Sequence, residues 1–244
     1  MKKLIVIIAI LFMGTFALYV LFDRGMIWFV YPDHNRFPVR GIDVSYHKGA
    51  IDWKKVRGEN IQFVFLKATE GDDFKDRMFQ DNWNNARAQN IAVGAYHFYS
   101  LRFPGDVQAK NFIDTTPVAS GSLPPVIDLE YGGNSIVRPT RGDFQKELAT
   151  YITLVREHYG QEPILYVTYE FYRDYLYPEF KNSPLWVRDL FREPTADNVQ
   201  SWRFWQYKNR GHIDGIDGYV DLNVFRGSSD ELEILRKSES LDNP

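Results

Sequence analysis

The sequence contains no cysteine, which excludes disulfide bonds and thiolate chemistry. Neither sign of charge is in large excess, because the formal net charge is only −3. Residues 1–30 hold three of the 29 basic and one of the 32 acidic residues, so the remaining chain carries a net charge of −5. A mildly acidic domain lacks the positive surface that nucleic acids require, and we expect no nucleic-acid partner. Internal repeats and low-complexity tracts are absent, and a hydrophobic content of 44% suits one folded domain.

A long hydrophobic run occurs at one place, the N-terminus. Lys2 and Lys3 precede residues 4–22, nineteen residues without a formal charge, which are enough to span a bilayer as a helix. A cleavable signal peptide has a shorter apolar region and a small-residue cleavage site, and the run contains no clear Ala-x-Ala. We therefore expect an uncleaved transmembrane helix, with secretion after signal cleavage as the alternative.

The charges beside this run predict its orientation. Two lysines precede it, which favours an N-terminus inside the cell and residues 25–244 outside the cytoplasm, in the periplasm or at the cell surface. Trp28, Phe29 and Tyr31 follow the run and suit a membrane–water interface. The expected organisation is a membrane anchor with its flanks at 1–30, a linker at 31–40, a folded domain at 41–230 and a C-terminal tail at 231–244.

Strand-like and helix-like segments alternate after the linker. The predicted strands cover residues 41–45, 62–68, 91–98, 125–130, 163–168, 185–189, 202–207 and 219–225. The predicted helices cover residues 52–57, 74–89, 106–115, 142–159 and 170–177. Five βα units followed by three strands with little helix between them predict an α/β barrel of eight mostly parallel strands. The active site of such a barrel lies at the C-terminal ends of its strands.

Two carboxyl groups end the fourth predicted strand. Asp128 and Glu130 stand two positions apart, so they point to the same side of the strand, about 6.6 Å apart along the backbone. Neighbouring carboxyls discourage each other's ionisation, which supplies a general acid beside an anionic partner, as glycosidic bond cleavage requires. Surface Asp-x-Glu pairs are common, but this pair follows the apolar residues 124–127. A magnesium or calcium site is the rival chemistry. Because the chain lacks a Gly-rich phosphate loop and His ligand spacing, we expect no metal and no cofactor.

Other polar and aromatic residues fall near the expected mouth of the barrel. Asp43 in the first strand and Asp221 in the last would complete an acidic cluster, because these two strands are neighbours in a closed barrel. The candidates for ligand contacts are Lys67, Glu70, Tyr96, Phe98, Tyr166, Asp189, Trp205, Gln206 and Asn223. The competing interpretations are an ion pair between Lys67 and Glu70, and core packing of Trp205. Arg188 and Asp189 could form part of the cleft or a simple ion pair. His97 is a candidate contact or a satisfied core histidine.

Six of these segments together resemble glycoside hydrolase family 25, the Chalaropsis-type lysozymes or N-acetylmuramidases. The resembling segments are residues 41–45 (Gly-Ile-Asp-Val-Ser), 63–71, 93–99, 125–130, 205–207 and 220–225, in the order and spacing of the family. The resemblance covers residues 41–227. It implies an irregular TIM-like (β/α)5(β)3 barrel and cleavage of the β-1,4 bond between N-acetylmuramic acid and N-acetylglucosamine. Peptidoglycan glycan strands are then the expected partner, bound by a monomer.

The resemblance also implies roles for the carboxyl groups. Glu130 would be the general acid/base, and Asp128 would orient the acetamido group of the substrate or act as nucleophile. Asp43 and Asp221 would complete the acidic site. The chain departs from the family pattern at Lys48, where Gln is usual, and at 185–190 (Leu-Trp-Val-Arg-Asp-Leu), where Leu-Trp-Ile-Ala-x-Tyr is common. The alternatives are a peptidoglycan-binding module of the same fold without activity, and a chitinase-like hydrolase.

Overall fold

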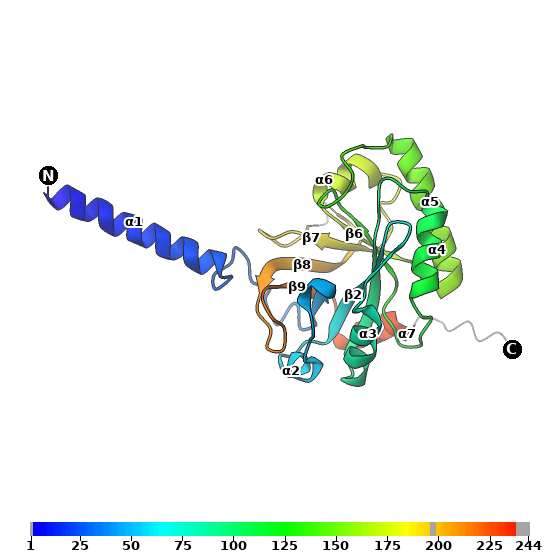
Figure 1. The fold of residues 1–244 in the computed structure, drawn as a ribbon, viewed down its shortest axis with the longest axis horizontal. Helices are drawn as coiled ribbons and strands as arrows, with labels where there is room; N and C mark the ends of the chain where they lie inside the picture. Colours follow the sequence, from blue (N-terminus) through cyan, green and yellow to red (C-terminus); the bar gives the residue numbers. More distant parts are fainter. Residues whose placement is uncertain (1, 196–198, 238–244) are drawn as a thin grey trace.

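Eight strands close into a barrel in the computed structural model of the chain, which describes residues 2–195 and 199–237 (Figure 1). The barrel strands are β1 (Arg40–Val44), β2 (Phe63–Glu70), β4 (Ala92–Phe98), β5 (Val126–Leu129), β6 (Ile164–Val167), β7 (Leu185–Arg188), β8 (Trp202–Gly211) and β9 (Val220–Phe225). The first seven barrel strands pair parallel with one another, whereas β9 lies antiparallel between β8 and β1. The pairing of β1 with both β2 and β9 closes the ring, which confirms the predicted barrel.

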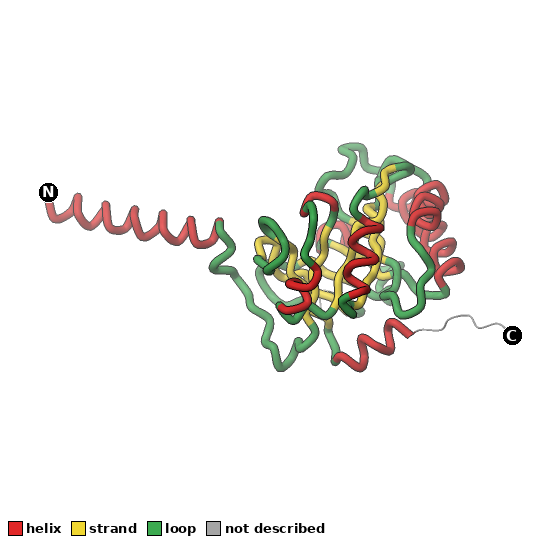
Figure 2. The backbone as a smooth tube through the Cα atoms, turned by 60° about the horizontal axis from the view of Figure 1, so that its bottom comes forward, coloured by secondary structure: helices red, strands yellow, loops and turns green. Residues whose placement is uncertain are grey.

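Helices follow the first five barrel strands and pack outside them (Figure 2). They are α2 (Trp53–Gly58), α3 (Phe79–Ala88), α4 (Gly105–Thr115), α5 (Arg141–Tyr159) and α6 (Tyr169–Phe171), the last continuing as a π-helical turn over Tyr172–Leu176. A 3-10 turn (Tyr46–Lys48) precedes α2, and α7 (Ser229–Lys237) follows β9. The last three barrel strands are joined without α-helices in the part of the chain that the structure describes. The order of elements therefore agrees with five βα units followed by three strands.

The helix predicted over residues 74–89 is shorter than expected. Its first residues, Phe74–Lys75, form the short strand β3, which pairs antiparallel with the end of β2. Asp76 then turns the chain, since its buried carboxylate accepts hydrogen bonds from the backbone N–H groups of Tyr46 and Met78. Helix α3 can begin only after this turn, at Phe79.

Large rings fill the interior of the barrel beneath its mouth. Phe65 stacks on Trp186 with ring centroids 4.7 Å apart, and Phe204 contacts Phe65 edge-on at 5.1 Å. Gly94 makes room for this layer, because a Cβ atom at its position would lie 2.6 Å from the ring of Phe65. The rings fill the barrel from below, which leaves its upper end for a ligand among the residues that the structure describes.

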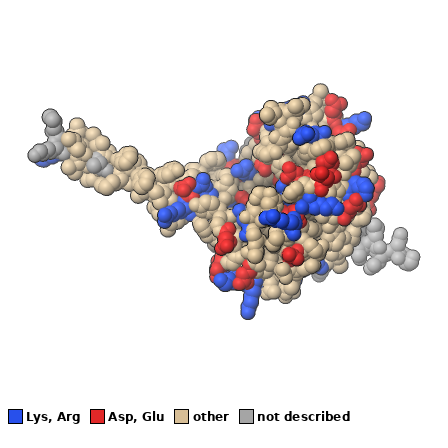
Figure 3. Space-filling model, viewed as in Figure 1, with Lys and Arg blue, Asp and Glu red and all other residues tan. Residues whose placement is uncertain are grey.

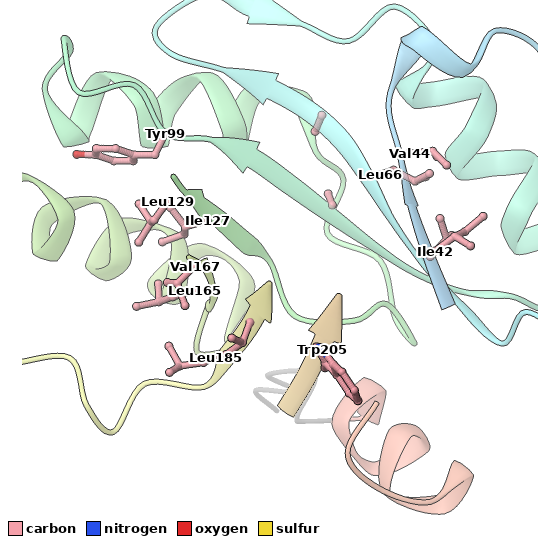
Figure 4. Close-up of a cluster of buried hydrophobic side chains, with 14 of the residues drawn as sticks. Ile42, Val44, Leu66, Tyr99, Ile127, Leu129, Leu165, Val167, Leu185 and Trp205 are labelled. Atoms are coloured by element: carbon pink, nitrogen blue, oxygen red, sulfur yellow. The ribbon is translucent and has the colours of Figure 1, made fainter. Parts of the chain in front are cut away.

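A second apolar layer lies between the barrel and its helices (Figure 4). Outward-facing strand residues such as Ile42, Leu66 and Ile127 are buried there. Helix α5 covers part of this layer and begins and ends as predicted. The side chain of Thr140 accepts a hydrogen bond from the backbone N–H of Asp143, and Gly160 ends the helix in the left-handed conformation.

Helix α1 (Lys2–Asp23) projects away from the barrel (Figures 1 and 2). Its segment Lys3–Asp23 is long and apolar enough to cross a membrane, and none of it is buried in the rest of the structure. The expected linker at 31–40 includes Phe37 and Val39, whose side chains are buried. Residues 231–237 of the expected tail belong to α7, and residues 238–244 lie outside the described residues.

Candidate active site

A pocket of about 240 Å³ opens at the C-terminal ends of the barrel strands. Its lining residues come from seven of the eight strands and their ends, and are Asp43, Tyr96, Asp128, Glu130, Tyr166, Trp186, Arg188, Gln206, Asn209 and Asp221. Inward-facing positions alternate along each strand, and those above the ring layer carry polar groups. The fold thus gathers all four predicted carboxyl groups, together with Tyr96, Tyr166 and Gln206, in one pocket.

Asp128 and Glu130 line this pocket together, as strand alternation predicts. The carboxyl of Asp128 is buried, and its Oδ1 atom has no hydrogen-bond partner within residues 2–195 and 199–237. Burial raises the pKa of Asp128 well above its usual value, and the charges of Glu130 and Asp43 add to this rise. Burial also raises the pKa of Glu130, although the charge of Arg188 opposes the rise. The guanidinium Nη1 of Arg188 lies 3.7 Å from Oε2 of Glu130.

Two amide side chains hold Asp43 in place. Oδ2 of Asp43 accepts hydrogen bonds from Gln206 Nε2 at 3.0 Å and Asn223 Nδ2 at 2.8 Å. The hydroxyl of Tyr166 donates to Gln206 Oε1, and the indole N–H of Trp186 donates to Asn223 Oδ1. These donors fix both amides with their NH₂ groups toward the carboxylate. Asn223 therefore acts from beneath the pocket and does not line it.

Asp221 faces Asp43 across the β1–β9 pairing. Burial and the charge of Asp43 raise the pKa of Asp221 well above its usual value, while the charge of Lys48 opposes the rise. Burial likewise raises the pKa of Asp43, against its hydrogen bonds and the charge of Lys48. The ammonium group of Lys48 is held by a hydrogen bond to the carbonyl of Tyr219.

The four carboxyl groups together can hold protons at a higher pH than isolated carboxyls would. Such a cluster provides both a proton donor and an anionic group within one pocket. Among the described residues, no group of three or more His, Asp or Glu side chains has an arrangement that could hold a metal ion. The chemistry that these carboxyls offer is acid–base chemistry.

A larger groove of about 730 Å³ lies beside the pocket and contains two more predicted contact residues, Glu70 and Phe98. Phe98 pairs with Asp128 in the β4–β5 register, so the groove and the pocket are neighbours. Lys67 donates a hydrogen bond of 2.6 Å to Glu70 Oε2, and its ammonium lies 5.1 Å from the ring centroid of Phe98. The alternative interpretation of Lys67 and Glu70 as an ion pair is thus correct, and the pair stands at the edge of the groove.

The structure does not bring Trp205 or Asp189 into the pocket. Trp205 is 1% exposed and packs in the outer apolar layer, with its indole N–H donating to the carbonyl of Asp189. Strand alternation explains this placement, because Gln206 faces inward and its neighbour must face outward. Asp189 caps the loop after β7, where its carboxylate accepts from the N–H groups of Phe191 and Arg192.

His97 lies in the outer layer as well, which corrects its interpretation as a candidate contact. Its ring is fully buried between Thr69, whose hydroxyl lies 2.7 Å from Nδ1, and Gln108, whose Oε1 lies 3.2 Å from Nε2. The amide NH₂ of Gln108 donates to two backbone carbonyls, so its oxygen is the acceptor and His97 carries its proton on Nε2. Burial lowers the pKa of His97 to about 3.

The predicted contacts omitted Trp186 and Asn209. Arg188, a candidate for the cleft or for an ion pair with Asp189, lines the pocket. Trp186 and Arg188 stand two positions apart on β7 and both face the pocket. Strand alternation in the sequence could have predicted that they face the same side. Asn209 had no comparable signal. It reaches the pocket because β8 shifts its register against β9 between Gln206 and Gly211, and such bulges leave little trace in a sequence.

The chain is similar to known proteins in both sequence and structure. The sequence model described as Glycosyl hydrolases family 25 matches residues 42–216. The uncharacterized protein YegX of Escherichia coli (strain K12) is 36% identical over 202 residues, which are 81% of this chain and 73% of that protein. Lysozyme M1 of Streptomyces globisporus is 31% identical over 210 residues, 81% of this chain and 71% of the relative. A solved family 25 glycosyl hydrolase from Bacillus anthracis is similar with a TM-score of 0.78 at 38% identity, covering 85% of this chain and 97% of that one.

Proposed function

This chain belongs to glycosyl hydrolases family 25 and is a glycoside hydrolase. We propose that it cleaves the β-1,4 bond between N-acetylmuramic acid and N-acetylglucosamine in peptidoglycan. The observation that carries this proposal is the convergence of Asp43, Asp128, Glu130 and Asp221 in one pocket, all with a raised pKa. The similarity to Lysozyme M1 supports the choice of peptidoglycan as substrate.

Glu130 is the proposed general acid and base. Its raised pKa keeps a proton available for the glycosidic oxygen as the bond to the leaving sugar breaks. The ionised carboxylate that remains then takes a proton from the attacking water. Glu130 suits this exchange because it is less enclosed than Asp128 and has one loose ionic partner, Arg188.

Asp128 is proposed to bind the acetamido group of the substrate. Its Oδ1 atom is buried in the pocket wall without a hydrogen-bond partner among the described residues, and a buried polar atom in that state is costly. The acetamido N–H of an amino sugar would supply the missing partner. Direct attack by Asp128 on the sugar is the alternative role, and both roles need Asp43 and Asp221 to shape the same acidic pocket.

Helix α1 is proposed to anchor the enzyme in a membrane with the barrel outside the cytoplasm. The support is its uninterrupted apolar length without burial, preceded by Lys2 and Lys3 in the sequence. An anchor predicts that the protein stays with membranes through an alkaline wash and is released by detergent. Release by the alkaline wash, or a mature chain lacking α1, would instead support secretion after cleavage.

Loss of turbidity of purified sacculi tests the proposed reaction. We expect Glu130→Gln to lower the rate at least about 10²-fold, the usual contribution of a general acid, while Glu162→Gln on the surface leaves it unchanged. The new reducing ends should carry muramic acid. Reducing ends of glucosamine would indicate chitinase-like specificity, and an inactive native protein would indicate a binding module.

A further inference from the structure

The end of α1 is attached directly to the barrel. The carboxylate of Asp23, the last residue of α1, pairs with Arg210 on β8, and its carbonyl accepts hydrogen bonds from Arg210 and from the hydroxyl of Tyr219. The carbonyl of Arg24 lies 2.8 Å from Nε2 of His212. No flexible residue separates the helix from these contacts, because they begin at Asp23 itself.

The next residues extend the attachment. The carbonyl of Gly25 accepts a hydrogen bond of 2.6 Å from the buried ammonium of Lys208, and the indole N–H of Trp28 donates to the carbonyl of Tyr207 at 2.8 Å. Gly25 has a φ of +64°, and a Cβ atom at its position would lie 2.0 Å from the carbonyl oxygen of Arg210. Close approach of the backbones at Gly25 therefore needs glycine.

This attachment lies at the rim of the catalytic pocket. Gln206 and Asn209 of β8 line the pocket, and the residues between and after them hold the end of α1. In Figure 1 the arrowhead of β8 points toward the side from which α1 leaves. The mouth of the barrel and the helix are thus on the same side of the molecule.

Exposed apolar side chains surround the end of α1 at this rim. Met26, Phe29 and Phe191 are each more than half exposed, and the rings of Phe29 and Phe191 contact each other with centroids 4.7 Å apart. Phe191 belongs to the loop after β7, so the patch joins the N-terminal segment to the barrel. Arg24 and Arg192, in the same two segments, are exposed as well. Figure 3 shows basic (blue) atoms near the base of the helix, with an acidic (red) group among them. Aromatic and basic residues together suit the surface of an anionic bilayer.

We propose that the barrel rests with the rim of its pocket on the membrane surface, so that its substrate is glycan lying against the membrane. Helix α1 has 22 residues and spans about 33 Å, close to the roughly 30 Å of a bilayer core, so Asp23 emerges at the lipid surface. Rigid attachment at Asp23 and Gly25 then holds the patch of Met26, Phe29 and Phe191 at the level of the headgroups. The inference rests on the proposed function and on α1 crossing the membrane.

A single cysteine label measures the distance of the rim from the lipid, because the chain has no cysteine of its own. The full chain is reconstituted in vesicles of phosphatidylethanolamine and phosphatidylglycerol that contain a headgroup-level quencher lipid. A fluorophore on Arg192→Cys, beside Phe191, should be quenched several-fold more strongly than one on Val118→Cys, an exposed position away from the rim. Equal quenching at the two positions overturns the proposal without bearing on enzymatic activity.

Two matched glycine substitutions test the attachment itself. Gly25→Val should detach the barrel and abolish the extra quenching at position 192, whereas Gly14→Val, where the added side chain meets open space, should preserve it. The native protein in vesicles should cleave lipid-linked glycan in the same membrane several-fold faster than added sacculi, and Gly25→Val should remove that preference. A native protein without this preference, or a Gly25→Val protein that keeps it, overturns the proposal. Failure of the proposed function would appear separately, as no cleavage of either substrate in detergent.

Discussion

Arg188 is the one basic side chain among the described residues that line the pocket, and it acts on Glu130. Its positive charge lowers the pKa of Glu130 against the effect of burial. As the proposed general acid, Glu130 must hold a proton, so we expect activity to fall as the pH rises through its pKa. Removing the charge in Arg188→Ala raises that pKa, and the basic limb of the profile of kcat/KM against pH should move to higher pH.

The control for this shift is Arg192→Ala, since Arg192 is nearby and exposed but pairs with Asp189 outside the pocket. Its profile should match that of the native enzyme. A basic limb that stays in place or moves to lower pH in Arg188→Ala would show that Arg188 does not set the protonation of the catalytic acid.

His97 contributes to the stability of the barrel in a pH-dependent way. Its pKa is lowered to about 3 in the folded state, whereas an unfolded histidine has a pKa near 6.5. The unfolded chain therefore takes up this proton first, and the stabilisation by neutral His97 is present above about pH 6.5 and is lost as the pH falls, at up to about 1.4 kcal/mol per pH unit.

Urea unfolding of the native protein and of His97→Gln isolates this effect. The buried carboxyls change stability in the opposite direction, because their raised pKa values favour the folded state at low pH, but they contribute equally to both proteins. The difference in free energy of unfolding should narrow from pH 7 to pH 5. His34→Gln, at an exposed position, should leave the pH dependence unchanged. If the difference in free energy of unfolding between the native protein and His97→Gln did not change with pH, His97 would not be a buried neutral histidine with a lowered pKa.

At the level of elements, strand packing depends on small residues under the ring layer. Gly94 on β4 faces Phe65 so closely that Gly94→Ala would force a methyl group to within 2.6 Å of the ring. We expect a loss of about 1–3 kcal/mol in the free energy of unfolding, the usual effect of overpacking. Gly58→Ala in α2, which meets open space, should be neutral or stabilising by up to about 1 kcal/mol. Equal effects of the two substitutions in chemical denaturation would refute this account.

The strands could be predicted almost completely because parallel barrel strands are continuous apolar runs between turn residues. The C-terminal end of β8 and the start of α3 could not be predicted in this way. Strand β8 continues to Gly211 with register shifts against its partner β9. Helix α3 starts late because the buried carboxylate of Asp76 accepts hydrogen bonds from backbone N–H groups of two segments. Both boundaries depend on contacts between residues far apart in the chain.

The acidic centre of the pocket was predictable for a local reason, whereas its surroundings were not. Asp128 and Glu130 end an apolar strand, and alternation alone places them on one side. Alternation also excludes Trp205 from the pocket, because its neighbour Gln206 faces inward. Its position near the expected mouth had nevertheless suggested a contact with the ligand. The network through Trp186 and Asn223 joins two distant strands, so it emerges only from the closed barrel.

At the scale of the whole molecule, helix α1, the proposed anchor, and the acidic pocket are joined through one strand, β8. The residues of β8 that hold α1 lie between and after those that line the pocket, so the same strand serves both. A substitution that loosens the attachment is therefore expected to change access to substrate more than the chemistry within the pocket.

The catalytic domain should nevertheless fold without its anchor. The buried hydrophobic side chains run from Phe37 to Leu232, so removing residues 1–30 takes away none of them. The loss includes the contacts of Asp23, Gly25 and Trp28 on β8. We expect a fragment of residues 31–244 to be soluble without detergent and monomeric in gel filtration. Its Tm should fall by a few degrees, since about 1 kcal/mol corresponds to roughly 2–4 °C in a domain of this size. An insoluble fragment, or one without a cooperative thermal transition, would show that the attached segment is part of the folding unit.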